Sequence, residues 1–559
     1  MKECIKQMVL PVVLCTSLLL SGCGGKEAAS SPGVTAASTE TISAAAAVTV
    51  QTISIEDLFS DRDMDQSYDE TDAVTVQLTG DTAVCSSDAV KIDGGRITLL
   101  DEGVYVFSGT LTDGQIVVNA DSSDKVQIVL SGADIISASS AAIYCLEADK
   151  VFLTLAEGST NALSNGGTFT AIDDNNIDAA VFSKTDLTLN GAGSLTVSSP
   201  AGHGIVSKDE LTITGGIYAV TAAKHGLTGK DSVAVAAGSF TVTSGKDGIH
   251  AENADDTSKG FLYIADGSFA IGSQGDAISA SGALQIDGGS YALTTGGGSA
   301  SATMKAGDTM QRPGFKDFSA AQSSADTADT AEDTESCKGI KADGALTVNG
   351  GTFVLDTADD AVHAGGDVTI TGGAWTIRTG DDGIHADAAV TIQAGTFSIP
   401  YCYEGVEGQS VTIDGGTLDI TAYDDGINAA GGADSSGMEF GFGKQDRFAT
   451  DENCFVIING GTITIVSDGD SIDSNGSLTV NGGTLDLTCN GNGNTAIDTN
   501  GTYTNNGGDV TTNDGSQAGT GGMGDGHGGT GSEKPLRNGE QDGTRPEAAR
   551  QRPEPGASA

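Results

Sequence analysis

The sequence predicts an all-β fold, a parallel β-helix (solenoid) built from three-strand coils of about 22 residues. Three observations support this prediction. Two series of residues recur at that interval, the apolar residues between them alternate with period two, and glycine is abundant while proline is scarce. Glycine accounts for 81 of the 559 residues and proline for 9. This composition is typical of many short strands joined by tight turns.

The first observation is a small residue followed by an aliphatic one, which recurs with several steps of 22 residues. The series is Gly204-Ile205, Gly226-Leu227, Gly248-Ile249, Ala277-Ile278, Gly339-Ile340, Ala361-Val362, Gly383-Ile384, Gly405-Val406, Gly426-Ile427, Ser471-Ile472 and Ala496-Ile497. Pairs of small residues such as Gly350-Gly351 and Gly372-Gly373 keep the same rhythm. A propeller repeat needs about 40 residues or more, so the short interval favours a solenoid.

The second observation is the alternation inside each unit. In one coil, short apolar runs occupy residues 362–364, 368–370 and 375–377, and glycine or aspartate separates them. Period-two alternation indicates strands with one buried face, and the runs are too short for helices. Trp375 alternates with the inward set, so we expect it in the core. One coil cannot bury its apolar face alone, and stacking on its neighbours completes the core.

The N-terminus predicts export. Lys2 and Lys6 precede an apolar run over 8–20, which is too short for a membrane span and is typical of a signal peptide. The ending Leu20-Ser21-Gly22-Cys23 resembles the lipobox of bacterial lipoproteins, which implies lipidation of Cys23. We therefore expect an extracytoplasmic protein, anchored at the bacterial cell membrane or surface through the N-terminal lipid only.

The composition also predicts the order of segments along the chain. We expect a signal peptide over 1–22, a flexible tether over 23–73, a β-helix over 74–506 with inserts at 298–336 and 431–453, and a disordered tail over 507–559. The net charge of −49 argues against a nucleic-acid partner, because a polyanion would be repelled. The cysteines beyond Cys23 show no C-x-x-C spacing, so we expect mainly buried free thiols.

Stacking gives the turns before each aliphatic residue a chemical meaning. Residues one coil apart become neighbours at about 4.8 Å, so acids in one register would repel each other unless a cation lay between them. Calcium binds six to eight oxygens and is the expected cofactor. The candidate ligands are Asp359, Asp360, Asp381, Asp382, Glu404, Glu407, Asp424, Asp425, Asp468, Asp470 and Asp473.

Two other interpretations of these residues remain open. Aspartate and glycine are common in turns for conformational reasons alone. Zinc could bind His363 and His385, but no third soft ligand accompanies them. We expect both histidines to be exposed polar residues on the acidic strip.

Three stretches near the start of the β-helix carry a family resemblance. They are Gly103-Val-Tyr-Val-Phe-Ser-Gly-Thr-Leu-Thr-Asp-Gly-Gln-Ile-Val-Val-Asn119, Asp124-Lys-Val-Gln-Ile-Val-Leu-Ser-Gly-Ala-Asp-Ile-Ile136 and Ala148-Asp-Lys-Val-Phe-Leu-Thr-Leu-Ala-Glu-Gly158. With the later Asp-Asp-Gly-Ile elements, they resemble a family of bacterial surface carbohydrate-binding lipoproteins over about residues 74–510. The resemblance implies a right-handed parallel β-helix related to pectate-lyase folds, several calcium ions, and binding of pectic or cellulosic polysaccharide.

Three functions follow as hypotheses. The first is calcium-dependent, non-catalytic polysaccharide binding by a monomer, with sugar contacts from His363, His385, Asn428, Tyr403 and Tyr423. The second is a polysaccharide lyase, which needs a base for β-elimination from a uronate. Its weak candidates are Lys224, Lys246 and Lys341. The third is a structural adhesin or matrix rod, in which calcium only rigidifies the solenoid.

Overall fold

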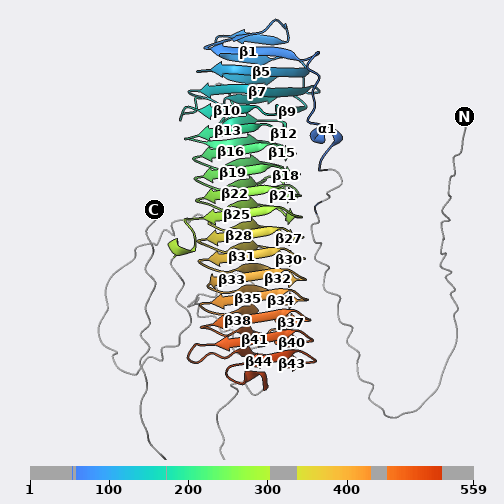
Figure 1. Ribbon diagram of the computed structural model, residues 1–559, viewed down its shortest axis with the longest axis vertical. Helices are drawn as coiled ribbons and strands as arrows, with labels where there is room; N and C mark the ends of the chain where they lie inside the picture. Colours follow the sequence, from blue (N-terminus) through green and yellow to red (C-terminus); the bar gives the residue numbers. More distant parts are fainter. Residues whose placement is uncertain (1–52, 54–57, 171–172, 303–335, 430–449, 519–559) are drawn as a thin grey trace, which may run out of the picture. The chain divides into compact units, whose positions relative to one another are not determined.

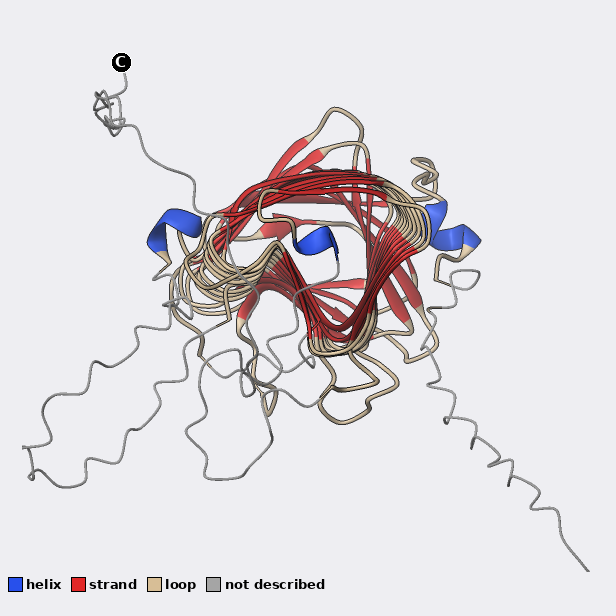
Figure 2. Ribbon diagram, turned by 90° about the horizontal axis from the view of Figure 1, so that it is seen from below, coloured by secondary structure: helices blue, strands red, loops and turns tan. Residues whose placement is uncertain are grey.

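The computed structural model describes residues 53, 58–170, 173–302, 336–429 and 450–518. The chain divides into two compact units, Met1–Thr49 and Val50–Ala559, and all described residues belong to the second. In that unit the strands stack along one axis as a parallel β-helix (Figure 1). Viewed along the axis, the strands superpose as three walls (Figure 2), and apolar side chains are buried between them.

The first wall, wall A, carries the Gly–aliphatic series of the sequence. Its register joins Ile205, Leu227 and Ile249 as direct neighbours, which confirms the repeat. The strands of wall A are β4 (Arg96–Leu99), β6 (Gln115–Asn119), β8 (Ile143–Glu147), β11 (Ala179–Ser183), β14 (His203–Ser207), β17 (Leu227–Gly229), β20 (Ile249–Ala251), β23 (Ile278–Ala280), β26 (Ile340–Ala342), β29 (Val362–Ala364), the first parts of β32 (Ile384–Ile392) and β34 (Val406–Ile413), β36 (Ile427–Ala429), β39 (Ile472–Ser474) and β42 (Ile497–Thr499).

Wall B follows wall A in each coil. Its strands are the first parts of β5 (Gly103–Leu111) and β7 (Lys125–Ser137), then β9 (Lys150–Leu155), β12 (Asp186–Gly191), β15 (Glu210–Ile213), β18 (Ser232–Val235), β21 (Phe261–Ile264), β24 (Leu284–Ile286), β27 (Leu346–Val348), β30 (Val368–Ile370), the second parts of β32 and β34, β37 (Phe455–Ile458), β40 (Ser477–Val480) and β43 (Tyr503–Asn505). The alternating burial along these strands places aliphatic residues inward and polar residues outward.

Wall C completes the coil. Its strands are the second parts of β5 and β7, then β10 (Thr160–Asn165), β13 (Ser194–Ser199), β16 (Ile217–Ala222), β19 (Ser239–Ser244), β22 (Ser268–Ser273), β25 (Ser290–Thr295), β28 (Thr352–Thr357), β31 (Ala374–Thr379), β33 (Thr396–Cys402), β35 (Thr417–Ala422), β38 (Thr462–Ser467), β41 (Thr484–Cys489) and β44 (Asp509–Thr512). At the N-terminal end, β1 (Val74–Gly80) pairs with β5, and β2 (Ala83–Val84) and β3 (Val90–Asp93) form antiparallel pairs. The helices are α1 (Asp61–Met64), η2 (Ser299–Ser301) and η3 (Ser516–Ala518).

A column of aromatic rings fills the interior beside wall C. Neighbouring centroids lie 3.7 Å to 5.7 Å apart along Tyr218, Phe240, Phe269, Tyr291, Phe353, Trp375 and Phe397. Trp375 is buried, as expected. The glycine two residues before each ring is required, because a Cβ on Gly216 would lie 2.6 Å from the Tyr218 hydroxyl and its φ is 105°. Stacking adds about 1 kcal/mol per pair to the burial of each ring.

Both long gaps in the repeat leave the ladder intact. Ile278 pairs directly with Ile340, and Ile427 pairs directly with Ile472, so the chain leaves the solenoid and re-enters it in register. Residues 303–335 and 430–449, most of the two expected inserts, lie outside the described residues.

The first strand, β1, begins at Val74, where the β-helix was expected to begin, but the segment before it and the C-terminal limit differ from expectation. The tether was expected to continue to residue 73, but α1 packs on wall B, where Lys150 Nζ lies 2.8 Å from the buried carboxylate of Asp63. The β-helix was expected to end at 506, but β44 pairs with β41 and the Asp514 carboxylate accepts the Ala496 amide, so the last coil reaches 518. A short polar segment that satisfies buried backbone groups carries no apolar signal in the sequence.

The signal peptide and Cys23 lie outside the described residues, as do residues 519–559 of the expected tail. Within the described part, none of the helices has the length and apolar character needed to cross a bilayer.

Candidate functional site

Two columns of polar residues run along wall A. The inner column is the residue before each small residue of the repeat, and the front column is the residue after each aliphatic one. Strand pairing and coil-to-coil backbone hydrogen bonds place the members of each column in register. The inner column is His203, His225, Asp247, Asp276, Lys338, Asp360, Asp382, Glu404, Asp425, Asp470 and Thr495. The front column is Val206, Thr228, His250, Ser279, Lys341, His363, His385, Glu407, Asn428, Asp473 and Asp498.

The inner-column aspartates have a structural task. Asp360 Oδ1 accepts the backbone N–H of Asp382 at 3.1 Å, and Asp382 Oδ1 accepts that of Glu404 at 3.1 Å. Asp247 and Asp276 repeat this bond to the following coil at 2.9 Å and 2.7 Å. A buried backbone N–H needs an acceptor, so one oxygen of each carboxylate joins consecutive coils. A conformational role in the turn therefore accounts for one oxygen of each carboxylate. The second oxygen remains for other contacts.

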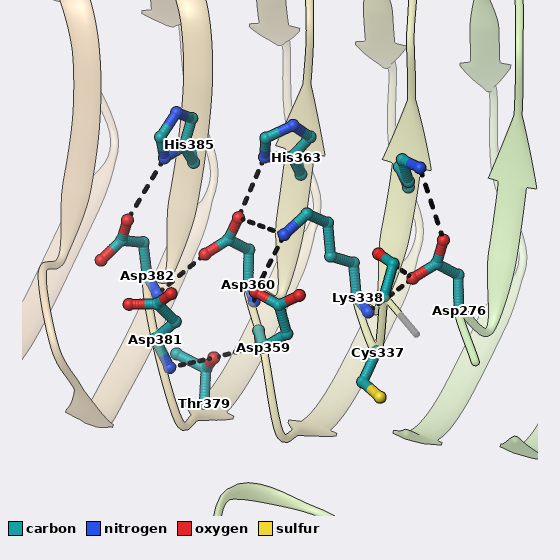
Figure 3. Close-up of polar contacts among 12 residues, drawn as sticks. Asp276, Cys337, Lys338, Asp359, Asp360, His363, Thr379, Asp381, Asp382 and His385 are labelled. Atoms are coloured by element: carbon teal, nitrogen blue, oxygen red, sulfur yellow. Dashed lines mark hydrogen bonds and ion pairs between the residues drawn. The ribbon is translucent and has the colours of Figure 1, made fainter. Parts of the chain in front are cut away.

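From His203 to His385 the second oxygens face cations, and we call this part the cation-paired segment. His363 Nδ1 lies 2.9 Å from Asp360 Oδ2, and Lys338 Nζ lies 3.0 Å from the same atom and 2.8 Å from Asp359 Oδ1 (Figure 3). Although burial opposes ionisation, His363 and Lys338 hold the pKa of Asp360 below its usual range. This carboxylate is stabilised as an anion by the protein's own side chains.

His385 corrects an expectation about exposure. Its side chain is fully buried, with Nδ1 3.2 Å from Asp382 Oδ2 and 3.0 Å from Glu407 Oε2. Burial lowers its pKa, but the two carboxylates outweigh burial and raise the pKa to about 11. The imidazolium is therefore an internal cation rather than an exposed polar group. The alternation of the strand predicts correctly that the His385 side chain points away from the solenoid core. It does not predict that neighbouring side chains on the outer face cover the ring.

From Glu404 to Asp498 the pattern changes, and we call this part the acid segment. The inner-column acids Glu404 and Asp470 are each followed three residues later by another acid, Glu407 and Asp473. Asp473 is in register with Asp498, and carboxylate oxygens of Asp470, Asp473 and Asp498 lie within 4.8 Å of one another. Where the cation-paired segment has a histidine or lysine, this segment therefore has another oxygen.

Raised pKa values are concentrated in the acid segment, while in the cation-paired segment burial and neighbouring acids also raise the pKa of Asp276 and Asp382. Burial and the neighbouring acids raise the pKa of Glu404 and Asp425 well above the usual range. The pKa of Asp470 rises to about 6, and that of Asp473 to about 7, because of burial and the carboxylates around each. Without an added cation, these groups hold protons at a pH where exposed carboxylates are ionised.

Asn428 adds an oxygen that has no protein donor. Its Nδ2 donates to Glu404 Oε2 at 2.9 Å, while its Oδ1 is buried and makes no hydrogen bond in the described part of the structure. Asn428 stands between Glu407 and Asp473 in the front column. A buried amide oxygen without a donor, set among carboxylates, fits a hard cation that binds oxygen.

The other predicted ligands fall at different places. Asp359 and Asp381 lie two residues before the small residue of their coils, beside the inner column (Figure 3), and oxygens of Asp359, Asp360 and Asp381 come within 4.8 Å of one another. Asp424, which directly precedes Asp425, takes the same position in its own coil. Asp468 is exposed and lies one register position outside the columns, because Gly469 takes the place beside Asp424.

The side chains predicted to contact sugar differ in how exposed they are. Tyr423 is 46% exposed beside the acid segment, whereas Tyr403 is buried, with its ring centroid 6.4 Å from that of Tyr423. His363 is half-buried and His385 is enclosed. Only Tyr423 of these four presents a large accessible face.

The lysines proposed as catalytic bases all have contacts. Lys224 Nζ lies 3.3 Å from Asp178 Oδ2, and Lys341 Nζ lies 3.5 Å from Asp343 Oδ1 and 3.9 Å from Asp276 Oδ2. Both ammonium groups therefore belong to ion pairs.

Sequence reasoning missed Lys338 and Asp498. Lys338 directly precedes Gly339 of the repeat, so the inner column already predicted its position. Asp498 follows Ile497 in the same way. Both could have been found by filling every position of the two columns instead of selecting the acidic pairs.

The fold and the site together define the class: a parallel β-helix with two columns of mostly polar residues, many of them acidic, along one wall. A family model described as "Carbohydrate-binding domain-containing protein" matches residues 93–383 and 381–523. Since this match covers most of the chain, the protein belongs to that family.

A protein of Acetivibrio thermocellus, also described as a carbohydrate-binding domain-containing protein, is 30% identical over 220 residues, which cover 39% of this chain. The match spans 66% of that relative's length. A solved structure, the gadolinium derivative of a polysaccharide lyase-like protein from C. thermocellum, is 32% identical, covers 40% of this chain and 92% of its own, and has a TM-score of 0.39.

Proposed function

We propose that this protein binds acidic polysaccharide through calcium held by the acid segment, without cleaving the polymer. The observation that carries the proposal is the loss of internal cations after His385. Glu404, Asp425, Asp470 and Asp473 are brought together by the coil stacking, and their pKa values are all raised. Membership of a carbohydrate-binding family supports the class of ligand.

The residues available fit calcium better than zinc. Carboxylates of Glu404, Glu407, Asp425, Asp470 and Asp473, with the amide oxygen of Asn428, supply the oxygens that calcium requires. No histidine or cysteine occupies either column of the acid segment, whereas zinc favours nitrogen and sulfur. A bound calcium ion would supply positive charge and open coordination positions for sugar carboxylates and hydroxyls.

Tyr423 adds an apolar surface at this place. Its exposed ring precedes Asp424 and Asp425 in the chain, so it lies at the edge of the acid segment. The face of a sugar ring packs well on such a ring, and burial of apolar surface would add to the ionic contacts. We therefore assign Tyr423 to the sugar contact, and we assign buried Tyr403 to its support.

The test is retention of the protein on polygalacturonate with calcium or with excess EDTA. We expect strong retention with calcium and much weaker retention with EDTA. The variant Asp425→Asn keeps an oxygen to accept the Asp470 amide, which Asp425 Oδ1 does at 2.6 Å, but it removes the charge. We expect this variant to need a calcium concentration about tenfold higher, which corresponds to about 1.4 kcal/mol.

The matched control is Asp419→Asn, since Asp419 is exposed on the neighbouring wall C in the same part of the solenoid. Unchanged retention in EDTA, or an equal effect of both variants, would contradict the proposal. Following ultraviolet absorbance in the same samples tests the lyase alternative. Accumulation of an unsaturated product with calcium would replace the binding function with an enzymatic one.

A further inference from the structure

A hollow lies on wall A within the cation-paired segment, away from the acid segment. It has a volume of about 290 Å³ and is formed over β14, β17 and β20. One wall is the loop at 252–255, which exists because the step from Ile249 to Ile278 is 29 residues instead of 22. Buried Asn253 fixes this loop by donating to Asp231 Oδ1 at 2.7 Å and accepting the Asp255 amide at 3.0 Å.

Two residues that line this hollow each carry a buried polar atom without a protein partner in the described part of the structure. Thr228 Oγ1 and His203 Nδ1 are buried and make no hydrogen bond among the residues that the structure describes. Leaving a buried polar atom unpaired costs about 1–3 kcal/mol, so such atoms in a hollow indicate a bound group. The Thr228 hydroxyl can donate to an anion, whereas His203 Nε2 faces Asp178 Oδ2 at 3.4 Å, so Nδ1 of a neutral His203 ring is an acceptor.

His225 supplies a second donor through its tautomer. The rings of His203, His225 and His250 stack, with centroids 5.0 Å and 4.3 Å apart. His225 Nδ1 accepts the Asp247 backbone N–H at 3.2 Å, nearer than the 3.5 Å to Asp247 Oδ2. Burial lowers the pKa of His225, which keeps the ring neutral and places its proton on Nε2. The ring therefore lines the hollow as an N–H donor, and its Nδ1 is not available to a metal.

One cation beside the hollow makes no close ion pair, and its electrostatic partner is the Asp178 carboxylate. Lys230 Nζ lies 2.7 Å from Asp255, and His250 Nε2 lies 3.1 Å from Glu252, so both acids of the loop are already paired. Lys208 also lines the hollow, and its ammonium makes no ion pair within the described ranges; its Nζ lies 5.5 Å from the centre of the Phe182 ring. In a chain with a net charge of −49, an ammonium without a close ion pair beside two donors favours an anion.

We propose that the hollow formed by His203, Lys208, His225 and Thr228 binds a carboxylate of an acidic sugar directly, without calcium. This inference rests on the proposed function, and it adds a second contact for the same polymer. Lys208 provides the charge, His225 Nε2 and Thr228 Oγ1 donate to the carboxylate oxygens, and the 252–255 loop closes one side. One rod then holds an acidic chain in two ways, through a metal in the acid segment and through its own donors here.

The test uses a short oligogalacturonate titrated by calorimetry into the full-length protein in excess EDTA. We expect binding that Lys208→Met and Thr228→Val each weaken by about tenfold, the equivalent of one hydrogen bond to a charged group. Lys91→Met is the matched control, because Lys91 is exposed on β3 at the N-terminal end of the solenoid, and it should leave the affinity unchanged. A neutral cello-oligosaccharide of equal length should bind at least tenfold more weakly.

Equal binding of the neutral and acidic oligosaccharides would overturn the inference, and so would wild-type affinity in both Lys208→Met and Thr228→Val. If EDTA abolishes oligogalacturonate binding while calcium-dependent retention on the polymer persists, this inference fails and the proposed function stands. If EDTA abolishes oligogalacturonate binding and calcium-dependent retention on the polymer is also absent, both the inference and the proposed function fail. Circular dichroism of each variant confirms that the solenoid is folded in the compared samples.

Discussion

Asp360 and Asp425 occupy the same column of the same wall, yet their carboxylates are in opposite states. Lys338 and His363 surround Asp360 and lower its pKa, whereas Asp473, Asp424 and Asp470 surround Asp425 and, with burial, raise its pKa. Even within the cation-paired segment, Asp276 has a pKa of about 6, because of burial and Asp247, with Lys341 Nζ at 3.9 Å. The comparison teaches that the solenoid fixes where carboxylates meet, while the residue one coil away decides whether the site is self-neutralised or requires a cation.

The largest expected effect comes from removing an internal cation, so that part of the cation-paired segment resembles the acid segment. Lys338→Met leaves Asp359 and Asp360 without their ammonium, and removing one partner of a buried ion pair costs about 3–5 kcal/mol. We expect the free energy of unfolding to fall by that amount in chemical denaturation. Calcium should then stabilise the variant more than the wild type, because a new acidic site has formed. Lys91→Met serves as the exposed control, and equal stability of the two variants would break the comparison.

Calcium should affect the two segments differently. At a hundredfold excess over its Kd, one ion stabilises the folded state by about 3 kcal/mol. Hydrogen exchange should slow at β36, β39 and β42 of the acid segment and change little at β17, β20 and β23. Uniform protection along the rod would show that the segments do not differ in their need for a cation. Magnesium at the same concentration is the control for ionic strength.

The pH dependence of the metal-free protein should come largely from the acid segment. The pKa of Asp473 is raised from 3.8 to about 7, so its stabilising contribution is present below pH 4 and is lost as the pH rises through 7. Asp473→Asn removes this loss, and we expect the variant to be more stable than the wild type at pH 8 in EDTA by roughly 2 kcal/mol. Thermal unfolding from pH 4 to 8 measures the difference. A variant with the pH profile of the wild type would show that Asp473 is ionised already.

The smallest effect is expected at the exposed aromatic. Tyr423→Ala should weaken calcium-dependent binding to polygalacturonate by about 1 kcal/mol, because it removes a packing surface and no ligand. Tyr423→Phe should bind like the wild type, and neither change should alter the melting temperature. Equal loss in both variants would point to the hydroxyl instead of the ring face.

The repeat made much of the fold predictable, and it failed where contacts are not local. The steps from Ile205 to Ile497 give the wall A register, including the two returns after long gaps. The same steps predicted that Asp360, Asp382 and Asp425 share one column. The exposure expected for His385 was wrong, because its enclosure depends on Asp382 and Glu407 from its own and the next coil. Asp63 was expected in a tether, since its partners Lys150 and Thr188 are distant in sequence.

The sequence by itself determined the periodic features: the three-strand coil, the inward residues and the columns of acids. These depend on local alternation and on a fixed interval, which any solenoid must convert into vertical neighbours. Only the tertiary structure decided which carboxylates are neutralised, which histidine is buried and where a hollow opens beside Thr228. Those properties depend on burial and on distances of a few ångströms between side chains of different coils, and the electrostatic energy of a charge changes steeply with both.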